Sequence, residues 1–325
     1  MSSTALTHRG VPSTVLAHRG GPVNRPDPPG VPSLSRTGRE PSARRDAVAS
    51  LRPRYSGAMA LPILIVGDVQ GDHERLAGAL VAYPEDQFET IFLGDFFTGG
   101  RPGDAGGHRA ARIAMGRRNS RAILGNHDLL VMALVEEGRY GGERLRARDG
   151  ELLETIWRRR RGDPADLEGL GGDPELEAWL RHLPVMLLLD DGTLVQHTDD
   201  DDYAALGDSV EQVNAAAAAL LAQEPGGVVR LLRHVIGRRA FDNRARLDAH
   251  LRRFGANRVI HGHTPHWKSC PDVRAGGRVI GFDGRFSRHW GRNPGEEAGP
   301  VGATIALLPP IPGPSSEHPQ ESAAP

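Results

Sequence analysis

Cysteine is almost absent from this sequence of 325 residues, since Cys270 is its only one. A single cysteine excludes an internal disulfide framework and predicts a reducing location, the cytoplasm. The sequence also lacks any run of about 18 apolar residues, so we expect no membrane-spanning helix. Neither sign of charge dominates: 40 basic and 41 acidic residues leave a formal net charge of -1. This balance gives no reason to expect a nucleic acid or a membrane as a partner.

The composition and its distribution along the chain indicate a folded domain between two polar terminal segments. Hydrophobic residues make up 38% and charged residues 25% of the chain, as in ordinary globular proteins. Residues 1–58 are rich in Pro, Gly, Ser and Arg without hydrophobic periodicity, so we predict a disordered extension. Because Met59 stands just before the first apolar run, the alternative is that this extension is not translated. We predict one domain over 59–308 and a disordered tail over 309–325.

Short apolar runs alternate with amphipathic stretches throughout the predicted domain. Each run is rich in aliphatic or β-branched residues and is bounded by Gly, Asp or Asn, which is typical of buried strands. The predicted strands are Ile63–Val66, Thr90–Leu93, Arg121–Leu124, Val185–Leu189, Thr193–Gln196, Val259–His261, Val279–Phe282 and Thr304–Leu308, with a hairpin signal at Asp191-Gly192. The predicted helices fill the gaps between the strands and include Asp72–Val81, Gly107–Arg117, Leu129–Glu137, Leu145–Arg160 and Ser209–Gln223. This alternation predicts an α/β sandwich with largely parallel or mixed sheets.

Polar side chains follow five of these runs: Asp68, Asp95, Asn126, His197 and His263. Ligands of α/β sheets bind at the carboxyl ends of the strands, where several loops converge. Carboxylate, amide and imidazole groups suit Mn, Fe, Zn or Mg rather than a thiolate site. A glycine precedes four of the five residues and lets the chain turn tightly there. The pattern therefore predicts a metal site where the carboxyl ends of the strands converge.

In this order, the motifs resemble those of the calcineurin-like metallophosphoesterase superfamily, whose pattern is GDxH…GDxxDRG…GNH(D/E)…H…GH. The Gly-His-Thr-Pro at 262–265 is closer to the phosphoprotein phosphatase and diadenosine tetraphosphatase branch than to nucleases, which carry Gly-His-x-His. The resemblance covers about residues 61–308. It implies a two-sheet metallophosphoesterase sandwich, with mixed sheets flanked by helices.

The resemblance also implies two divalent metal ions, with Mn favoured among Mn, Fe, Zn and Mg. The implied ligands are Asp95 as the bridge, Asn126, His197 and His263 for one metal, and Asp68 with Gln70 for the other. Two cations can clamp a phosphate group and lower the pKa of a bound water, so that a metal-bound hydroxide attacks the phosphorus.

The remaining roles concern the substrate. His127, beside the implied ligand Asn126, is placed to give a proton to the departing alkoxide. Asn126, together with basic side chains, would bind the phosphate oxygens, and Arg238 and Arg239 are the candidates.

Three positions depart from the family pattern. Gln70 stands where relatives have histidine, and an amide oxygen is a weaker donor than imidazole, so the second metal is expected to bind less tightly. Thr98 replaces the carboxylate that orients the catalytic histidine, which leaves His127 without its usual partner. Gly99 replaces a phosphate-binding arginine, and Arg101, two residues on, is the candidate substitute.

Two charged runs have simpler interpretations. The four aspartates Asp199–Asp202 predict a solvated loop, with attraction of cations to the neighbouring His197 as the alternative. Arg158–Arg161 predict the C-terminal end of a helix, where positive charge is favourable; the alternative is a docking patch for phosphoproteins or RNA.

The sequence thus predicts a metal-dependent phosphoester hydrolase acting on phosphorylated substrates. The leading hypothesis is a phosphomonoesterase of the serine/threonine protein phosphatase kind. The alternatives are hydrolysis of dinucleoside polyphosphates, and a weakly active, phosphate-binding regulatory relative.

Overall fold

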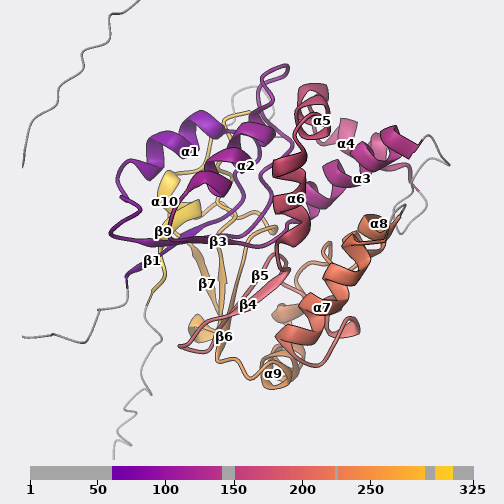
Figure 1. Ribbon diagram of the computed structural model, residues 1–325. Helices are drawn as coiled ribbons and strands as arrows, with labels where there is room; N and C mark the ends of the chain where they lie inside the picture. The colour runs from indigo at the N-terminus through magenta and orange to yellow at the C-terminus, as the bar shows by residue number, and fades with distance from the viewer. Residues whose placement is uncertain (1–60, 141–150, 224–225, 290–296, 310–325) are drawn as a thin grey trace, which may run out of the picture. The chain divides into compact units, whose positions relative to one another are not determined.

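The computed structural model describes residues 61–140, 151–223, 226–289 and 297–309 (Figure 1). The predicted extension 1–58, with Met59, lies outside the described residues, as do the tail from 310 onward and the start of the predicted helix Leu145–Arg160. None of the described helices is long and apolar enough to cross a lipid bilayer.

Two mixed sheets form the centre of the described chain. The first has the order β3-β2-β1-β9 and the second the order β4-β5-β6-β8-β7. In the first, β1 (Ile63–Val66), β2 (Glu89–Phe92) and β3 (Ser120–Ala122) run parallel, whereas β9 (Ile305–Leu307) is antiparallel to β1. In the second, β5 (Thr193–Gln196), β6 (Arg258–His261) and β8 (Val279–Gly281) run parallel, with β4 (Met186–Leu188) and β7 (Asp272–Arg274) antiparallel at the edges. This arrangement confirms the predicted fold class.

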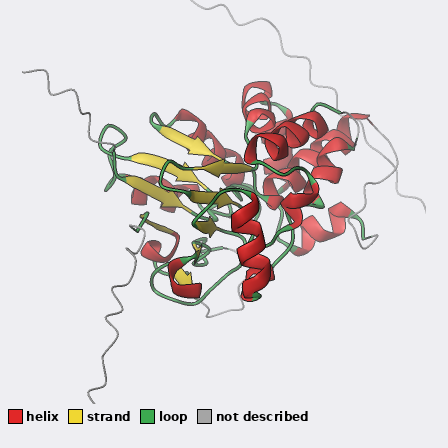
Figure 2. Cartoon of the chain, turned by 90° about the horizontal axis from the view of Figure 1, so that it is seen from below, coloured by secondary structure: helices red, strands yellow, loops and turns green. Residues whose placement is uncertain are grey.

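Alternating side chains of each strand divide the core into two layers. Ile65 and Ile91 of the first sheet share one buried cluster with Ile260 of the second, so the two sheets face each other there. Leu64 and Val66 point the opposite way and belong to a larger cluster shared with the helices. Successive strand residues point to opposite faces, so continuous apolar runs are what a sheet covered on both sides needs. Figure 2 shows the helices around the stacked strands.

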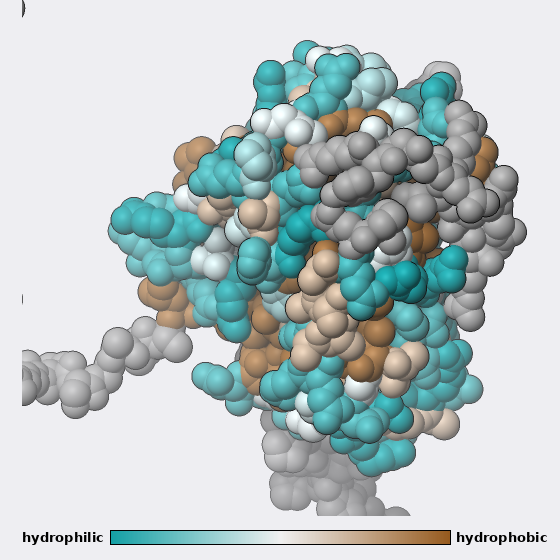
Figure 3. Space-filling view, turned by 45° about the vertical axis from the view of Figure 1, so that its right-hand side comes forward, coloured by the Kyte–Doolittle hydropathy of each residue, from teal (hydrophilic) through white to brown (hydrophobic). Residues whose placement is uncertain are grey.

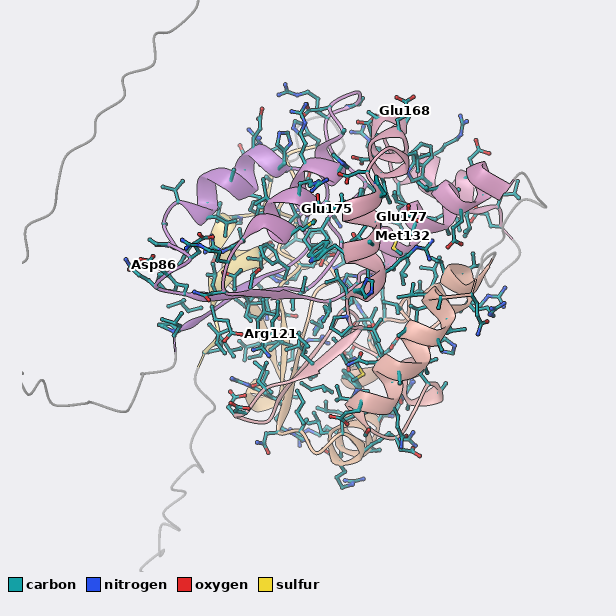
Figure 4. All side chains as sticks on the ribbon, viewed as in Figure 1. Asp86, Arg121, Met132, Glu168, Glu175 and Glu177 are labelled. Atoms are coloured by element: carbon teal, nitrogen blue, oxygen red, sulfur yellow. The ribbon has the colours of Figure 1, made fainter. Side chains whose placement is uncertain are left out.

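The helices cover the outer faces of the sheets (Figure 1). They are α1 (His73–Leu80), α2 (Gly106–Gly116), α3 (Asn126–Tyr140), α4 (Leu153–Arg159), α5 (Pro164–Gly171), α6 (Pro174–His182), α7 (Val210–Leu221), α8 (Gly227–Leu232), α9 (Arg244–Arg253) and α10 (Val301–Thr304). Charged contacts join some of them: Arg112 of α2 contacts Asp173 and Glu175 at the start of α6, and Figure 4 labels Glu175. The face in Figure 3 is largely hydrophilic, with small apolar patches between polar groups.

All eight predicted strands occur, with ends within two residues of the prediction, and β4 and β5 form the predicted hairpin. Strand β7 was missed because it is three residues long and carries only one apolar side chain. Helices α5, α6, α8, α9 and α10 were also missed. Asp163-Pro164 and Asp173-Pro174 are the N-cap and first-turn signals that could have located α5 and α6.

Candidate metal centre and substrate cavity

The carboxyl ends of the strands carry the predicted site residues. Asp68 follows β1, Asp95 follows β2, and His197 and His263 follow β5 and β6; all four are buried. Helix α3 begins at Asn126, three residues before the predicted start, so that Asn126 lies in its first turn. Tertiary contacts decide this early start, because the Asp128 carboxylate accepts hydrogen bonds from the backbone N–H groups of Gly125 and Asp95, both at 2.9 Å.

Four of the predicted ligands converge on one point. Ligand atoms of Asp95, His197 and His263 all lie within 4.8 Å of one another. Nε2 of His197 is 3.2 Å from Oδ1 of Asp95 and 3.0 Å from Oδ1 of Asn126. Nδ1 of His263 is 2.7 Å from the same Asn126 oxygen. One carboxylate, one amide oxygen and two imidazoles therefore surround a common position, and this donor set fits a divalent transition metal.

The orientation of His197 supports a ligand role. Its Nδ1 donates to the carbonyl oxygen of Leu93 at 2.7 Å, so the lone pair of Nε2 faces Asp95 and Asn126. Such a contact on the far side of the ring is the usual companion of a metal-binding histidine.

Charge and burial favour the metal-binding forms of Asp95 and His263, whereas at His197 the Asp95 carboxylate outweighs burial and raises the pKa. Burial alone would raise the pKa of Asp95, but the imidazoles of His197 and His127 lower it below its usual value, which leaves an ionised carboxylate. Burial, with the nearby His197 and Arg238, lowers the pKa of His263 well below its usual value, which leaves a neutral imidazole. Metals bind ionised carboxylates and neutral imidazoles.

Close backbone approach explains the glycine before Asn126. A Cβ atom on Gly125 would lie 2.2 Å from Oδ1 of Asp95 and 2.3 Å from its backbone nitrogen. Asp95 itself has a left-handed backbone, with φ of 56°, and its Oδ1 accepts the N–H of His127 at 2.8 Å. Only glycine at 125 leaves room for this geometry.

A second group of polar atoms lies beside the first. Asp68 accepts the backbone N–H of His263 at 2.9 Å, and its pKa is raised by burial and by the carboxylates of Asp283 and Asp95. Oε1 of Gln70 is buried and has no hydrogen-bond partner among the described residues. A buried oxygen without a partner and a set of crowded carboxylates are what a cation would satisfy, so the donors fit a second metal.

Asp283 is a site residue that the sequence analysis missed. It follows β8, is buried, and has a pKa raised to about 6 by burial and by the nearby Asp95. The parallel pairing of β6 with β8 brings it to the same sheet edge as His263. Its Gly-Phe-Asp-Gly setting at 281–284 repeats the pattern of an apolar run followed by a carboxylate, and this signal could have found it.

His127 has a hydrogen-bond partner even though the carboxylate of the family pattern is missing. Oγ1 of Thr98 forms a buried hydrogen bond with Nδ1 of His127. The hydroxyl can replace the orienting part of the usual carboxylate, although it brings no negative charge. Burial lowers the pKa of His127 to about 4, with Asp95 opposing the shift and Arg160 adding to it.

A cavity of about 560 Å³ adjoins the metal centre. Its lining includes Asn126, His127 and His263 from the centre, and a wall of apolar and basic residues: Leu130, Leu153, Ile156, Arg159, Arg160, Val229, Leu232, Arg233, Ile236 and Arg238, with Glu151. Nε of Arg238 lies 2.9 Å from Nε2 of His263, which places its guanidinium at the mouth of the centre.

The other two predicted substrate arginines lie elsewhere. Arg239 is exposed and does not line the cavity, and its backbone N–H donates to Asp199 at 3.0 Å. Arg101 is exposed and lines a separate small hollow with Asp72 and Asp104. Their positions give the predicted substrate roles no support. Three arginines that the sequence analysis did not propose as substrate-binding line the cavity instead: Arg159, Arg160 and Arg233.

The aspartate run also differs from its prediction. Asp199 and Asp200 are buried, so the expectation of a solvated loop was wrong for half of the run. Asp199 accepts a hydrogen bond from Oγ1 of Thr264 at 2.6 Å and pairs with Arg274 at 2.7 Å. These partners fix the loop after β6, and no single-sequence pattern reveals them.

Two facing mixed sheets that present Asp, Asn and His ligands beside a basic cavity define a metal-dependent hydrolase of phosphorylated compounds. Residues 61–267 match the sequence profile of the calcineurin-like phosphoesterase family. The chain therefore belongs to this family, and it is a hydrolase acting on phosphoester bonds. No curated protein sequence matches it.

Comparison with solved structures finds similar chains at low identity. A cold-active protein-tyrosine phosphatase from a psychrophilic Shewanella species is 18% identical, with a TM-score of 0.47 over 69% of this chain and 71% of that one. A point mutant of a cold-active protein tyrosine phosphatase is 17% identical, with a TM-score of 0.50 over 77% and 81%. A putative diadenosine tetraphosphatase is 17% identical, with a TM-score of 0.38 over 69% and 83%.

Proposed function

We propose that this chain is a phosphomonoesterase that uses two divalent metal ions, with Mn²⁺ favoured. The observation that carries the proposal is the convergence of Asp95, Asn126, His197 and His263 at the mouth of a cavity that also contains His127 and Arg238. Oxygen and nitrogen donors without a thiolate suit Mn²⁺.

The proposed ligands divide between two positions. Asp95, Asn126, His197 and His263 would hold one metal, and Asp68, Gln70 and Asp283 would hold the other, with Asp95 contributing to both. When bound, the two ions supply charge neutralisation at the phosphoryl group and a lowered pKa for the attacking water.

The side chains around the centre bind the substrate and hold the proton. Arg238 pairs with the phosphoryl oxygens, and Asn126 lies beside them. His127 faces the leaving oxygen and donates a proton to it, while Thr98 keeps the imidazole ring in place. A bound phosphoryl dianion places negative charge beside His127, which favours the protonated form that this step needs.

Hydrolysis of p-nitrophenyl phosphate with added Mn²⁺ tests the proposal, with Asp95→Asn as the inactive comparison. We expect turnover that depends on metal and falls by at least about 100-fold in the variant. Equal turnover by both proteins, or none with any of the four candidate metals, would contradict the proposal.

A second candidate function is hydrolysis of dinucleoside polyphosphates. Several arginines and an apolar wall in one cavity favour a ligand with more than one phosphate and an aromatic body. Comparing kcat/KM for diadenosine tetraphosphate, a phosphoserine peptide and p-nitrophenyl phosphate separates the two candidates. Tight binding of phosphate without turnover of any of them would instead identify a regulatory relative.

The proposed location and boundaries follow from the sequence. We propose a cytoplasmic protein, because the single thiol of Cys270 is exposed and suits a reducing compartment.

We also propose one catalytic domain over 59–308, preceded by the extension 1–58 and followed by the tail 309–325. Mass spectrometry of the native N-terminus tests the alternative start at Met59.

A further inference from the structure

We propose that Arg160, directly after α4, is a second phosphate-binding residue that works with Arg238 on the phosphoryl group of the substrate. It takes the place of the arginine that the family pattern has where this chain has Gly99. This inference rests on the proposed function, since it concerns the same phosphoryl group.

The backbone brings the end of α4 to the loop that carries Gly99. The N–H of Gly99 donates to the carbonyl oxygen of Arg161 at 3.3 Å. The segment between α4 and α5 is held to the same loop by a second contact. The carboxylate of Asp163 accepts the backbone N–H groups of Gly103, Asp104 and Ala105 at 3.0–3.1 Å. The chain at 160 is therefore held beside the position from which the missing arginine would extend.

The side chain lines the cavity at the metal centre. Arg160 shares this lining with Asn126, His127, His263 and Arg238. Its neighbour Arg159 also reaches the cavity but pairs with Glu151 at 2.8 Å. Arg158, two residues before Arg160, pairs with Glu154 and does not line the cavity.

The positive charges of Arg160 and Arg238 face the same cavity. Arg160 is exposed, but partial burial and the positive charge of Arg238 both lower its pKa, whereas the carboxylate of Asp95 opposes this shift. Because Arg160 and Arg238 line the same cavity, their guanidinium groups repel each other, and a bound dianion would relieve the repulsion. A guanidinium presents a planar fork of donors that matches phosphate oxygens, so a phosphoryl group is the anion this pair fits.

Binding of inorganic phosphate to the Mn²⁺-loaded full chain, followed by calorimetry, tests the proposal directly. We expect Arg160→Ala to weaken phosphate binding by about 10–100-fold, as loss of a charged hydrogen bond does. Arg160→Lys keeps the charge but loses the fork, so its affinity is expected to lie between those of Arg160→Ala and the wild type. Arg158→Ala is the matched control and is expected to bind phosphate as the wild type does.

Kinetics and metal content complete the test. With p-nitrophenyl phosphate, we expect Arg160→Ala to raise KM and lower kcat, while the bound metal measured by elemental analysis stays at the wild-type level. Wild-type phosphate affinity in Arg160→Ala, or a loss of metal from it, would overturn the assignment. Phosphate binding is measured without turnover. The role of Arg160 in phosphate binding can therefore be judged even if the protein does not catalyse the proposed reaction.

Discussion

Thr98 and His127 lie 29 residues apart in the sequence, and Oγ1 of the first forms a hydrogen bond with Nδ1 of the second inside the protein. Thr98 is fully buried and has a left-handed backbone, with φ of 66°, which is unfavourable for a β-branched residue. Such backbone geometry persists only where the surroundings impose it. The contact orients the imidazole ring toward the cavity without adding a charge to it.

Removal of this hydroxyl is expected to slow the reaction while the metals remain. In Thr98→Val the ring of His127 loses this hydrogen bond, and we expect kcat to fall by about 10–100-fold. Steady-state kinetics with p-nitrophenyl phosphate and elemental analysis measure the two quantities. Thr98→Ser keeps the hydroxyl and is the control.

A carboxylate introduced at position 98 tests the effect of the negative charge that is missing beside His127. Thr98→Asp restores the carboxylate of the family pattern, and aspartate also tolerates the left-handed backbone better than threonine. We expect a higher kcat because a carboxylate stabilises protonated His127. A kcat below that of Thr98→Ser would show that the hydroxyl is the better partner here.

Gly125 provides a steric test of the metal centre. Gly125→Ala is expected to displace Asp95, since the added Cβ would lie 2.2 Å from its Oδ1, and so to lower the metal content and the activity together. Elemental analysis after dialysis against a chelator measures the first effect. Gly116→Ala is the matched control, because no atom lies within 4 Å of the Cβ it would add. Full metal retention in Gly125→Ala would be evidence against Asp95 as a ligand.

Substitutions at Gln70 and Asp283 test the proposed second metal position. Imidazole is a stronger donor than an amide oxygen, so Gln70→His is expected to raise the number of tightly held ions toward two. Asp283→Asn removes a buried carboxylate from the same group and is expected to lower that number. Metal titration of both variants and the wild type gives the counts. Identical occupancy in all three proteins would refute a weak second position.

Asp166 is expected to make stability depend on pH. It is buried, its Oδ1 accepts the N–H of His108 at 3.0 Å, and burial raises its pKa to about 6. The folded protein therefore keeps a proton that the unfolded chain releases near pH 4. This contribution to the free energy of unfolding is complete below about pH 4 and is lost as the pH rises through about 6, by roughly 3 kcal/mol.

Urea unfolding between pH 4 and pH 8 measures this effect. Asp166→Asn has no proton to lose, so its free energy of unfolding is expected to decline less than that of the wild type over this interval. Asp208→Asn changes an exposed carboxylate and is the control. Parallel curves for wild type and Asp166→Asn would contradict the prediction.

The fold and the first metal position were largely predictable because their signals are local. Runs such as Ile63–Val66 show both the strand and, through the polar residue that follows, the sheet edge. Helix and strand ends were less predictable where distant groups intervene. Helix α3 starts early because Asp128 binds backbone groups of the β2 loop, a contact that neighbouring residues alone do not indicate.

The sequence alone determined where the strands lie along the chain and which side chains follow them, because alternation, burial and turn signals act over a few residues. Tertiary structure alone decided which charges meet. It buried Asp199 against Arg274, placed Arg160 rather than Arg101 at the cavity, and gave His127 the hydroxyl of Thr98. The physical reason is that a charge's position depends on the packing of segments far apart in the chain, whereas a strand's position depends mainly on its own residues.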